Sequence, residues 1–247
     1  MNSLLKMTWM ELKLFFREPI GAFFTLVFPL MMLFLFGSIY GNEPSKYFNG
    51  YGTVDISVPA YTAMIIATTG LMSLAITMSA YRENGVLRRL RTTPISPLLI
   101  LTAQVVVLLL MTIIGMVLLV IAGKLVYHMR FEGNVFDVIL GFILSSLSFF
   151  AIGFVIAGFM PNARTAQIVG MVILYPMLFL SGAGFPRELL PETIKKVSTF
   201  LPLTYVVNLL RGLWIGESWA GHQTEVLVLT IILIIGVLVS IKVFRWE

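Results

Sequence analysis

The chain has 247 residues, of which 58% are hydrophobic and 12% charged, with a mean hydropathy of +0.95 and a formal net charge of +5. An ordinary soluble domain contains roughly 25% charged residues, so this composition argues against one and indicates a membrane protein. The chain has no cysteine, which excludes a disulfide framework and thiolate metal sites.

Uncharged apolar runs predict an all-α polytopic membrane protein. Hydrocarbon forces a spanning backbone to satisfy its own hydrogen bonds, and about 20 apolar residues are enough for a helix to cross. No cleavable signal peptide is expected before the first run, because the 19 preceding residues carry acids as well as bases. Six runs predict six transmembrane helices, at residues 20–40, 59–80, 98–123, 138–159, 166–182 and 226–241.

The N-terminal segment 1–19 is predicted to be a helix that lies in the cytoplasmic membrane interface. Its apolar residues align on one face at helical spacing and its bases on another, and Pro19 then turns the chain into the membrane. A plain cytoplasmic extension of the first span is the alternative. The apolar face comprises Leu5, Trp9, Leu12 and Phe16, the basic face Lys6, Lys13 and Arg17, and the candidate interfacial residues are Trp9, Lys13, Phe16 and Arg17.

The distribution of lysine and arginine predicts that both termini are cytoplasmic. With six spans, residues 1–19, 81–97, 160–165 and 242–247 share one side of the membrane. The positive-inside rule places the side with more bases in the cytoplasm. Ten of the 17 bases lie in these four segments: Lys6, Lys13, Arg17, Arg82, Arg88, Arg89, Arg91, Arg164, Lys242 and Arg245.

The loop "YRENGVLRRLRTTPIS" after the second run combines four arginines with an apolar stripe. The arginines can act simply as topology determinants. If Tyr81–Arg91 is helical, however, Glu83, Val86, Leu87 and Leu90 share one face, and the arginines surround it. Such a short amphipathic helix has the form of a docking element for a protein partner. It is too short and too closely held between two spans to suit nucleic acid.

The remaining polar loops carry no recognisable chemistry. Residues 41–58 and 124–137 are predicted to be exposed connections. His128 and His222 have no partner at ligand spacing, so a metal site is not expected. The segment Gly115–Leu125 has the wrong spacing for a phosphate-binding loop.

Residues 185–225 contain two apolar pieces, 188–200 and 203–210, that are each too short to span a membrane. Proline punctuates them, and Gly212 is placed where a helix is expected to end. Short broken helices of this hydropathy are expected to be interfacial or re-entrant and to pack on protein. Pro202 is predicted to join the two pieces, with Tyr205 and Asn208 on the second.

The predicted span interiors contain no Asp, Glu, Lys, Arg or His. The acidic residues Asp137 and Glu225 lie at span edges. Proton- or ion-coupled carriers commonly keep such a residue at membrane depth, so its absence argues against a secondary transporter. Sodium sites built from backbone carbonyls remain possible. The chain is not expected to be an enzyme, and energy for any transport is expected to come from elsewhere.

Together these features resemble the type-2 ABC transporter permeases, in particular those of the drug-resistance (daunorubicin-type) exporters. The likeness covers nearly the whole chain. Three motifs carry it in this order: "ELKLFFREP", "YRENGVLRRLRTTPIS" and "LSGAGFPRELLPETIKKVSTFLPLTYVVNLLRG".

The resemblance implies an ATP-driven exporter of a hydrophobic or amphiphilic substrate, such as a drug or a lipid, built from two permeases and two separate ATPase subunits in the cell membrane. ATP and Mg²⁺ would bind to the ATPase, and no cofactor to this chain. The alternatives are an ion-coupled carrier or channel that acts without an ATPase, and a membrane anchor that recruits a cytoplasmic partner. The implied ATPase-coupling residues are Tyr81, Arg82, Glu83, Val86, Leu87, Arg88, Leu90 and Arg91, and the implied exit-path residues, on external re-entrant helices within 185–212, are Pro186, Pro202, Tyr205, Asn208 and Arg211.

Overall fold

The computed structural model describes residues 3–17, 19–86, 97–185, 187 and 190–243, and these residues form helices and connections without a β-strand. Six helical stretches in this part of the chain are long and apolar enough to cross a membrane. The predicted all-α fold with six spans is therefore confirmed. The stretches are Phe23–Tyr40, Thr53–Glu83, Leu99–Tyr127, Val135–Phe159, Ala163–Leu180 and Trp219–Val243.

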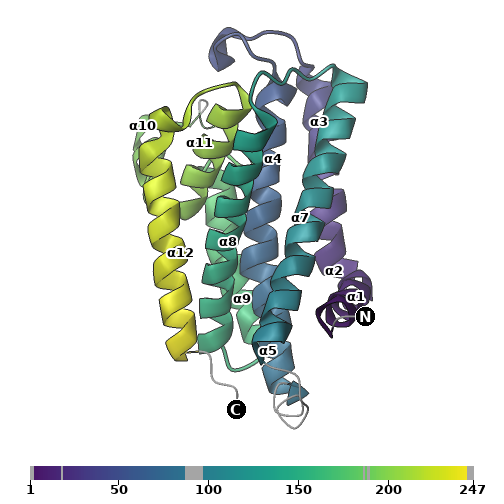
Figure 1. Cartoon of the computed structure of the whole chain (residues 1–247). Helices are drawn as coiled ribbons and strands as arrows, with labels where there is room; N and C mark the ends of the chain where they lie inside the picture. The colour runs from purple at the N-terminus through teal and green to yellow at the C-terminus, as the bar shows by residue number, and fades with distance from the viewer. Residues whose placement is uncertain (1–2, 18, 87–96, 186, 188–189, 244–247) are drawn as a thin grey trace.

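The spanning stretches lie side by side as an upright bundle (Figure 1). The first two contain π-helical segments, which have a wider turn than an α-helix. The first consists of η1 (Phe23–Val27) and α3 (Phe28–Tyr40), and the second of α4 (Thr53–Thr68), η3 (Thr69–Leu74) and α5 (Ala75–Glu83). The others are α7 (Pro97–Tyr127), α8 (Val135–Phe159), α9 (Ala163–Leu180) and α12 (Gln223–Val243), which follows a short turn, η5 (Trp219–His222).

The second stretch, α4–η3–α5, is the centre of the bundle. It contacts α3 and α7 on one side and α8, α9 and the later helix α11 (Pro202–Trp214) on the other. In its most apolar 18-residue window 89% of the residues are buried, against 11% in α12. The helix therefore meets protein rather than lipid over most of its surface, and it tolerates polar residues that a lipid-facing helix would not.

This second stretch begins earlier than predicted, because α4 starts at Thr53 rather than at residue 59. Residues 54–58 are buried, so the prediction that residues 41–58 form an exposed connection is wrong for this part. Asp55 and Ser57 made the segment look polar in the sequence. Inside the protein they face other polar groups rather than hydrocarbon, and the helix can include them.

Helix α1 (Ser3–Arg17) packs beside the lower part of the bundle, against α7 and next to the short α2 (Pro19–Ala22) (Figure 1). The predicted helix is present, and Trp9 and Phe16 of its predicted apolar face are 58% and 57% exposed. A different face packs on the bundle, because Met7 and Phe15 are buried there. The geometry is compatible with a helix at a membrane surface, which stays a prediction.

The segment after α9 folds into α10 (Glu192–Ser198) and α11, with Pro202 at the first turn of the second helix as predicted. Two details differ from the prediction. The first helix begins at Glu192 rather than at 188, and the second continues through Gly212 to Trp214. Gly212 does not end the helix, and its missing side chain leaves room for the ring of His222.

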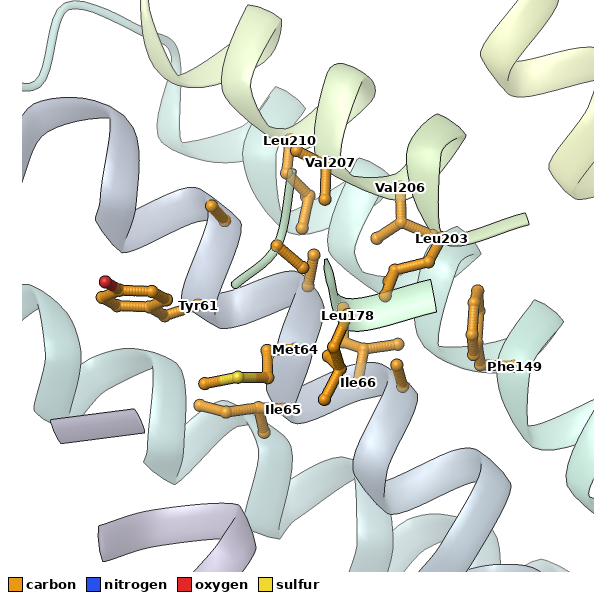
Figure 2. Close-up of a cluster of buried hydrophobic side chains, with 14 of the residues drawn as sticks. Tyr61, Met64, Ile65, Ile66, Phe149, Leu178, Leu203, Val206, Val207 and Leu210 are labelled. Atoms are coloured by element: carbon orange, nitrogen blue, oxygen red, sulfur yellow. The ribbon is translucent and has the colours of Figure 1, made fainter. Parts of the chain in front are cut away.

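Helix α11 closes the core over the middle of α4. Its apolar side chains point toward α4 and toward Leu178 of α9 (Figure 2). Phe200, in the turn before α11, is by contrast 86% exposed. The re-entry of α10 and α11 into the membrane stays a prediction. The buried residues of α11 are Leu203, Thr204, Val206, Val207, Leu209, Leu210, Gly212, Leu213 and Trp214.

A close crossing in the bundle joins η3 to α8. A Cβ atom added at Gly153 would collide with the carbonyl oxygen of Gly70, and one added at Gly70 would lie 2.8 Å from the backbone of Phe149. Small residues at such crossings allow helix backbones in membranes to approach closely.

We predict that Gly153→Ala lowers the free energy of unfolding by about 1–3 kcal/mol, because the backbone at the crossing has to shift. Thermal unfolding in detergent measures this loss. Gly221→Ala is the matched control, since no atom lies within 4 Å of a Cβ added there. Equal stability of the two variants would contradict the close crossing.

Candidate functional site

A cavity of about 330 Å³ opens at the end of the bundle opposite α1, between the start of α4, α11 and the turn before α12. Of the predicted exit-path residues, Asn208 and Arg211 line it. Three carboxyl groups and one imidazole also contribute to its wall. The lining residues are Phe48, Asn49, Tyr51, Asp55, Ile56, Pro59, Asn208, Arg211, Gly212, Ile215, Glu217, Gly221, His222 and Glu225.

Asp55 is the most buried of these carboxylates, with no exposed surface. Its Oδ1 accepts hydrogen bonds from Asn42 Nδ2 and the backbone N–H of Arg130, both at 2.8 Å. Its Oδ2 accepts bonds from the Gly52 N–H at 2.9 Å and from Arg130 Nε at 3.2 Å. Four donors thus satisfy the carboxylate, and they tie α4 to two loops that are far apart in the sequence.

The loop 128–134 is therefore not the unremarkable connection that was predicted. The side chain of Arg130 lies 5.8 Å from the ring centroid of Tyr51 and donates to the carbonyl oxygen of Gly50. The Tyr51 hydroxyl donates to Glu132 at 2.9 Å. This hydrogen bond, together with partial burial, raises the pKa of Tyr51 above 10, so the phenol stays a donor at physiological pH.

His222 is also not isolated, contrary to the prediction. Its Nε2 lies 2.8 Å from Glu217 Oε2, and its Nδ1 lies 3.8 Å from Glu225 Oε2. The ring is buried against Gly212 of α11. Among the described residues, no group of three His, Asp or Glu side chains is arranged to hold a metal ion.

The other predicted exit-path residues lie beside the cavity or outside the described residues. Pro202 starts α11, and the Tyr205 hydroxyl donates to the carbonyl oxygen of Thr199 at 2.7 Å. Tyr205 therefore fastens the junction of α10 and α11 and does not line the cavity. Pro186 lies outside the described residues.

At the opposite end, the predicted single helix over Tyr81–Arg91 is wrong in its first part. Residues 81–83 are the last turn of α5, which ends at Glu83, and Asn84 and Gly85 form a turn. Gly85 has a φ of 64°, a conformation that glycine adopts without strain. Val86 is the last residue described before Pro97, and the predicted coupling residues Leu87, Arg88, Leu90 and Arg91 lie outside the described residues.

The three predicted coupling residues at the end of α5 each contact another helix or its flanking residue. The Tyr81 hydroxyl lies 2.8 and 2.7 Å from the two carboxylate oxygens of Glu11 in α1. Arg82 Nη1 donates to the carbonyl oxygen of Gly158 in α8. Glu83 Oε2 accepts from the Ala163 N–H, so it caps the first turn of α9. Residues 81–83 therefore join three other helices at this end.

We predict that Asp55→Leu lowers the free energy of unfolding by about 3 kcal/mol, since four donors lose a buried acceptor. Arg130→Met costs less, because the Arg130 side chain is 42% exposed. Thermal unfolding in detergent measures the loss of stability in each variant. A larger loss for Arg130→Met than for Asp55→Leu would contradict the central role of the carboxylate.

Comparison with known proteins places this architecture in a family. A family model described as "ABC-2 type transporter" matches residues 2–214. Nodulation protein J of Rhizobium leguminosarum bv. viciae is 31% identical over 102 residues, which are 41% of this chain and 39% of that protein. The inner membrane transport permease YhhJ of Escherichia coli (strain K12) is 26% identical over 196 residues, 74% of this chain and 50% of YhhJ.

A further relative, the putative transport permease ycf38 of Porphyra purpurea, is 21% identical over 232 residues, 92% of this chain and 79% of ycf38. The matched region thus spans about half of YhhJ and less of nodulation protein J. The family model, by contrast, covers most of the six-helix bundle described above. The chain therefore belongs to the ABC-2 type transporter family of polytopic membrane proteins.

Proposed function

We propose that the chain is the transmembrane permease subunit of an ATP-driven ABC exporter in the cell membrane. The observation that carries this proposal is the family match over residues 2–214, which covers the first five of the six membrane-spanning stretches. Two of the relatives are named transport permeases. A separate ABC ATPase subunit would bind ATP and Mg²⁺ and would supply the energy.

The contacts at the end of α5 support a coupling role for the segment that starts at Tyr81. A partner that moves this segment acts through residues 81–83 on α1, α8 and α9 together. The arginines and leucines that follow, at positions 87–91, remain the proposed docking surface. Glu83 has a structural task in addition, because it caps α9.

The chemistry at the opposite end favours an exporter over an ion-coupled carrier. Asp55 belongs to a spanning stretch that starts earlier than predicted, but it lies at the edge of that stretch and not in a span interior, where no ionisable residue was predicted. Its position is in the first turn of α4, and four donors from the protein satisfy its carboxylate. Binding a coupling ion there would require breaking those hydrogen bonds.

The proposed substrate is hydrophobic or amphiphilic, such as a drug, a lipid or a similar compound, and a homodimer of the permease would form the path. The cavity lined by Asn208 and Arg211 would lie near the exit. Among the described residues, many large apolar side chains are exposed on α3, α9 and α12. These faces suit contact with lipid or with a second copy of the chain.

We predict that Arg88→Glu and Leu87→Asp reduce co-purification of the ATPase at least tenfold, since they reverse a charge or place a carboxylate in an apolar contact. The measurement is capture of the ATPase by the tagged permease, with substrate-stimulated ATP hydrolysis as a second readout. Lys46→Glu, at the other end of the bundle, serves as the control. Transport by the purified permease without any ATPase would refute the proposal in favour of a carrier or channel.

The proposed orientation makes a separate prediction about the membrane sides. The chain has no cysteine, so single cysteines introduced as Ser3→Cys, Thr92→Cys and Ser45→Cys can be labelled one at a time. In intact cells an impermeant thiol reagent should label position 45 and spare positions 3 and 92. The reverse pattern would show that the termini are external.

A further inference from the structure

A groove of about 340 Å³ runs along the outer surface of the bundle between α7 and α8. Its wall is almost entirely aliphatic and aromatic. Val117, Val135 and Ile139 are exposed as well as lining it, so the groove opens sideways to the surroundings of the bundle. The lining residues are Ile113, Met116, Val117, Val120, Lys124, Phe131, Val135, Val138, Ile139, Phe142, Ile143 and Trp214.

The length of the groove matches the hydrocarbon depth of one membrane leaflet. Along α7 its lining runs from Lys124 to Ile113, which at 1.5 Å per residue is roughly 16 Å. The hydrocarbon core of a bilayer is about 30 Å thick, so one leaflet is about half of that. Lining residues of α8 run in the opposite direction, from Val135 to Ile143.

The polar groups gather at one end of the groove. Lys124 lies in the last turn of α7, is exposed, and makes no hydrogen bond or ion pair with any described residue. Trp214 at the same end is 4% exposed, and its indole N–H has no acceptor within the described part of the chain. Its ring packs edge-on against Phe131 with centroids 4.8 Å apart. A buried donor without a partner costs free energy unless a ligand supplies the acceptor.

We propose that this groove binds an acyl chain of an anionic phospholipid. The chain lies against the apolar wall toward Ile113, the phosphate pairs with Lys124, and an ester oxygen accepts the hydrogen bond of Trp214. Charge favours this occupant, because Lys124 is the one ionisable side chain among the lining residues and it stands at headgroup level. The proposal concerns lipid binding alone and does not rest on the proposed transport function.

The test is retention of lipid by the purified full-length chain. The protein is equilibrated with equal amounts of phosphatidylglycerol and phosphatidylcholine of identical chains, washed in detergent, and the bound lipids are counted by native mass spectrometry. We expect phosphatidylglycerol to be retained about fivefold over phosphatidylcholine, a factor that one lysine near the membrane surface supplies. Inorganic phosphate should not displace it, since it has no acyl chain.

Two matched pairs of variants test the wall and the charge. Val117→Trp fills the groove and should abolish retention of both lipids, whereas Leu118→Trp, one position away and outside the lining, should not. Lys124→Gln should remove the preference for phosphatidylglycerol, which Lys124→Arg and Lys46→Gln should keep.

Equal retention by Val117→Trp and Leu118→Trp would overturn the proposal, as would an unchanged lipid preference in Lys124→Gln. Loss of a dimer in Val117→Trp, measured in the same mass spectra, would show that a second copy of the chain occupies the groove instead. ATPase binding enters none of these readouts, so the result is independent of the permease proposal.

Discussion

The burial of α4–η3–α5 at the centre of the bundle determines how the other helices pack. A helix that is 31 residues long and crosses the bundle without facing lipid has to find its contacts inside the protein. Close approach of its neighbours provides them, and this explains why Gly70 meets the backbone of α8 and why Gly153 has no side chain at that crossing. Helix α11 covers the remaining side with a nearly continuous apolar face.

Burial of this central helix also explains where the polar residues lie. Hydrocarbon would penalise Asp55 heavily, yet inside the protein its carboxylate accepts hydrogen bonds from four donors in the loop before α4 and the loop after α7. The peripheral helices show the opposite pattern. In α12 the described residues that face outward are chiefly leucine, isoleucine and valine, because lipid or another chain must cover them.

The sequence alone predicted the six spans well, since an uncharged apolar run as long as 138–159 matches the thickness of the hydrocarbon core. It did not predict the hydrogen bonds between residues that are far apart in the sequence. Nothing near Asp55 reveals Arg130, 75 positions later, and nothing near Glu83 reveals the start of α9. The end of α5 at Glu83 was predictable, because Asn84-Gly85 is a recognised turn signal. The helical spacing of the residues on both sides of this turn led to the prediction of one continuous helix.

The cavity residues show the same limit for the candidate site. Asn208 and Arg211 followed from the resemblance of the segment around them, and both line the cavity. His222, Glu217 and Glu225 were missed, because their proximity depends on the turn before α12 and on the missing side chain at Gly212. Hydrophobic periodicity does not predict the contact of His222 with α11, because that contact depends on the absence of a side chain at Gly212.

The two ends of the bundle are fastened in different ways, and this difference bears on how motion could pass along it. At the cavity end, α4 is held by a buried carboxylate that accepts four hydrogen bonds. At the opposite end, residues 81–83 of α5 make hydrogen bonds to α1, α8 and α9, and the bond from the Ala163 N–H to Glu83 is exposed. The exposed hydrogen bond exchanges with water at little cost, whereas the buried Asp55 carboxylate would lose four donors if α4 moved away from them. The helices α4, η3 and α5 form one continuous stretch. If Tyr81 moves while Asp55 stays in place, the residues between them have to absorb the displacement, and these residues include the wider turn of η3.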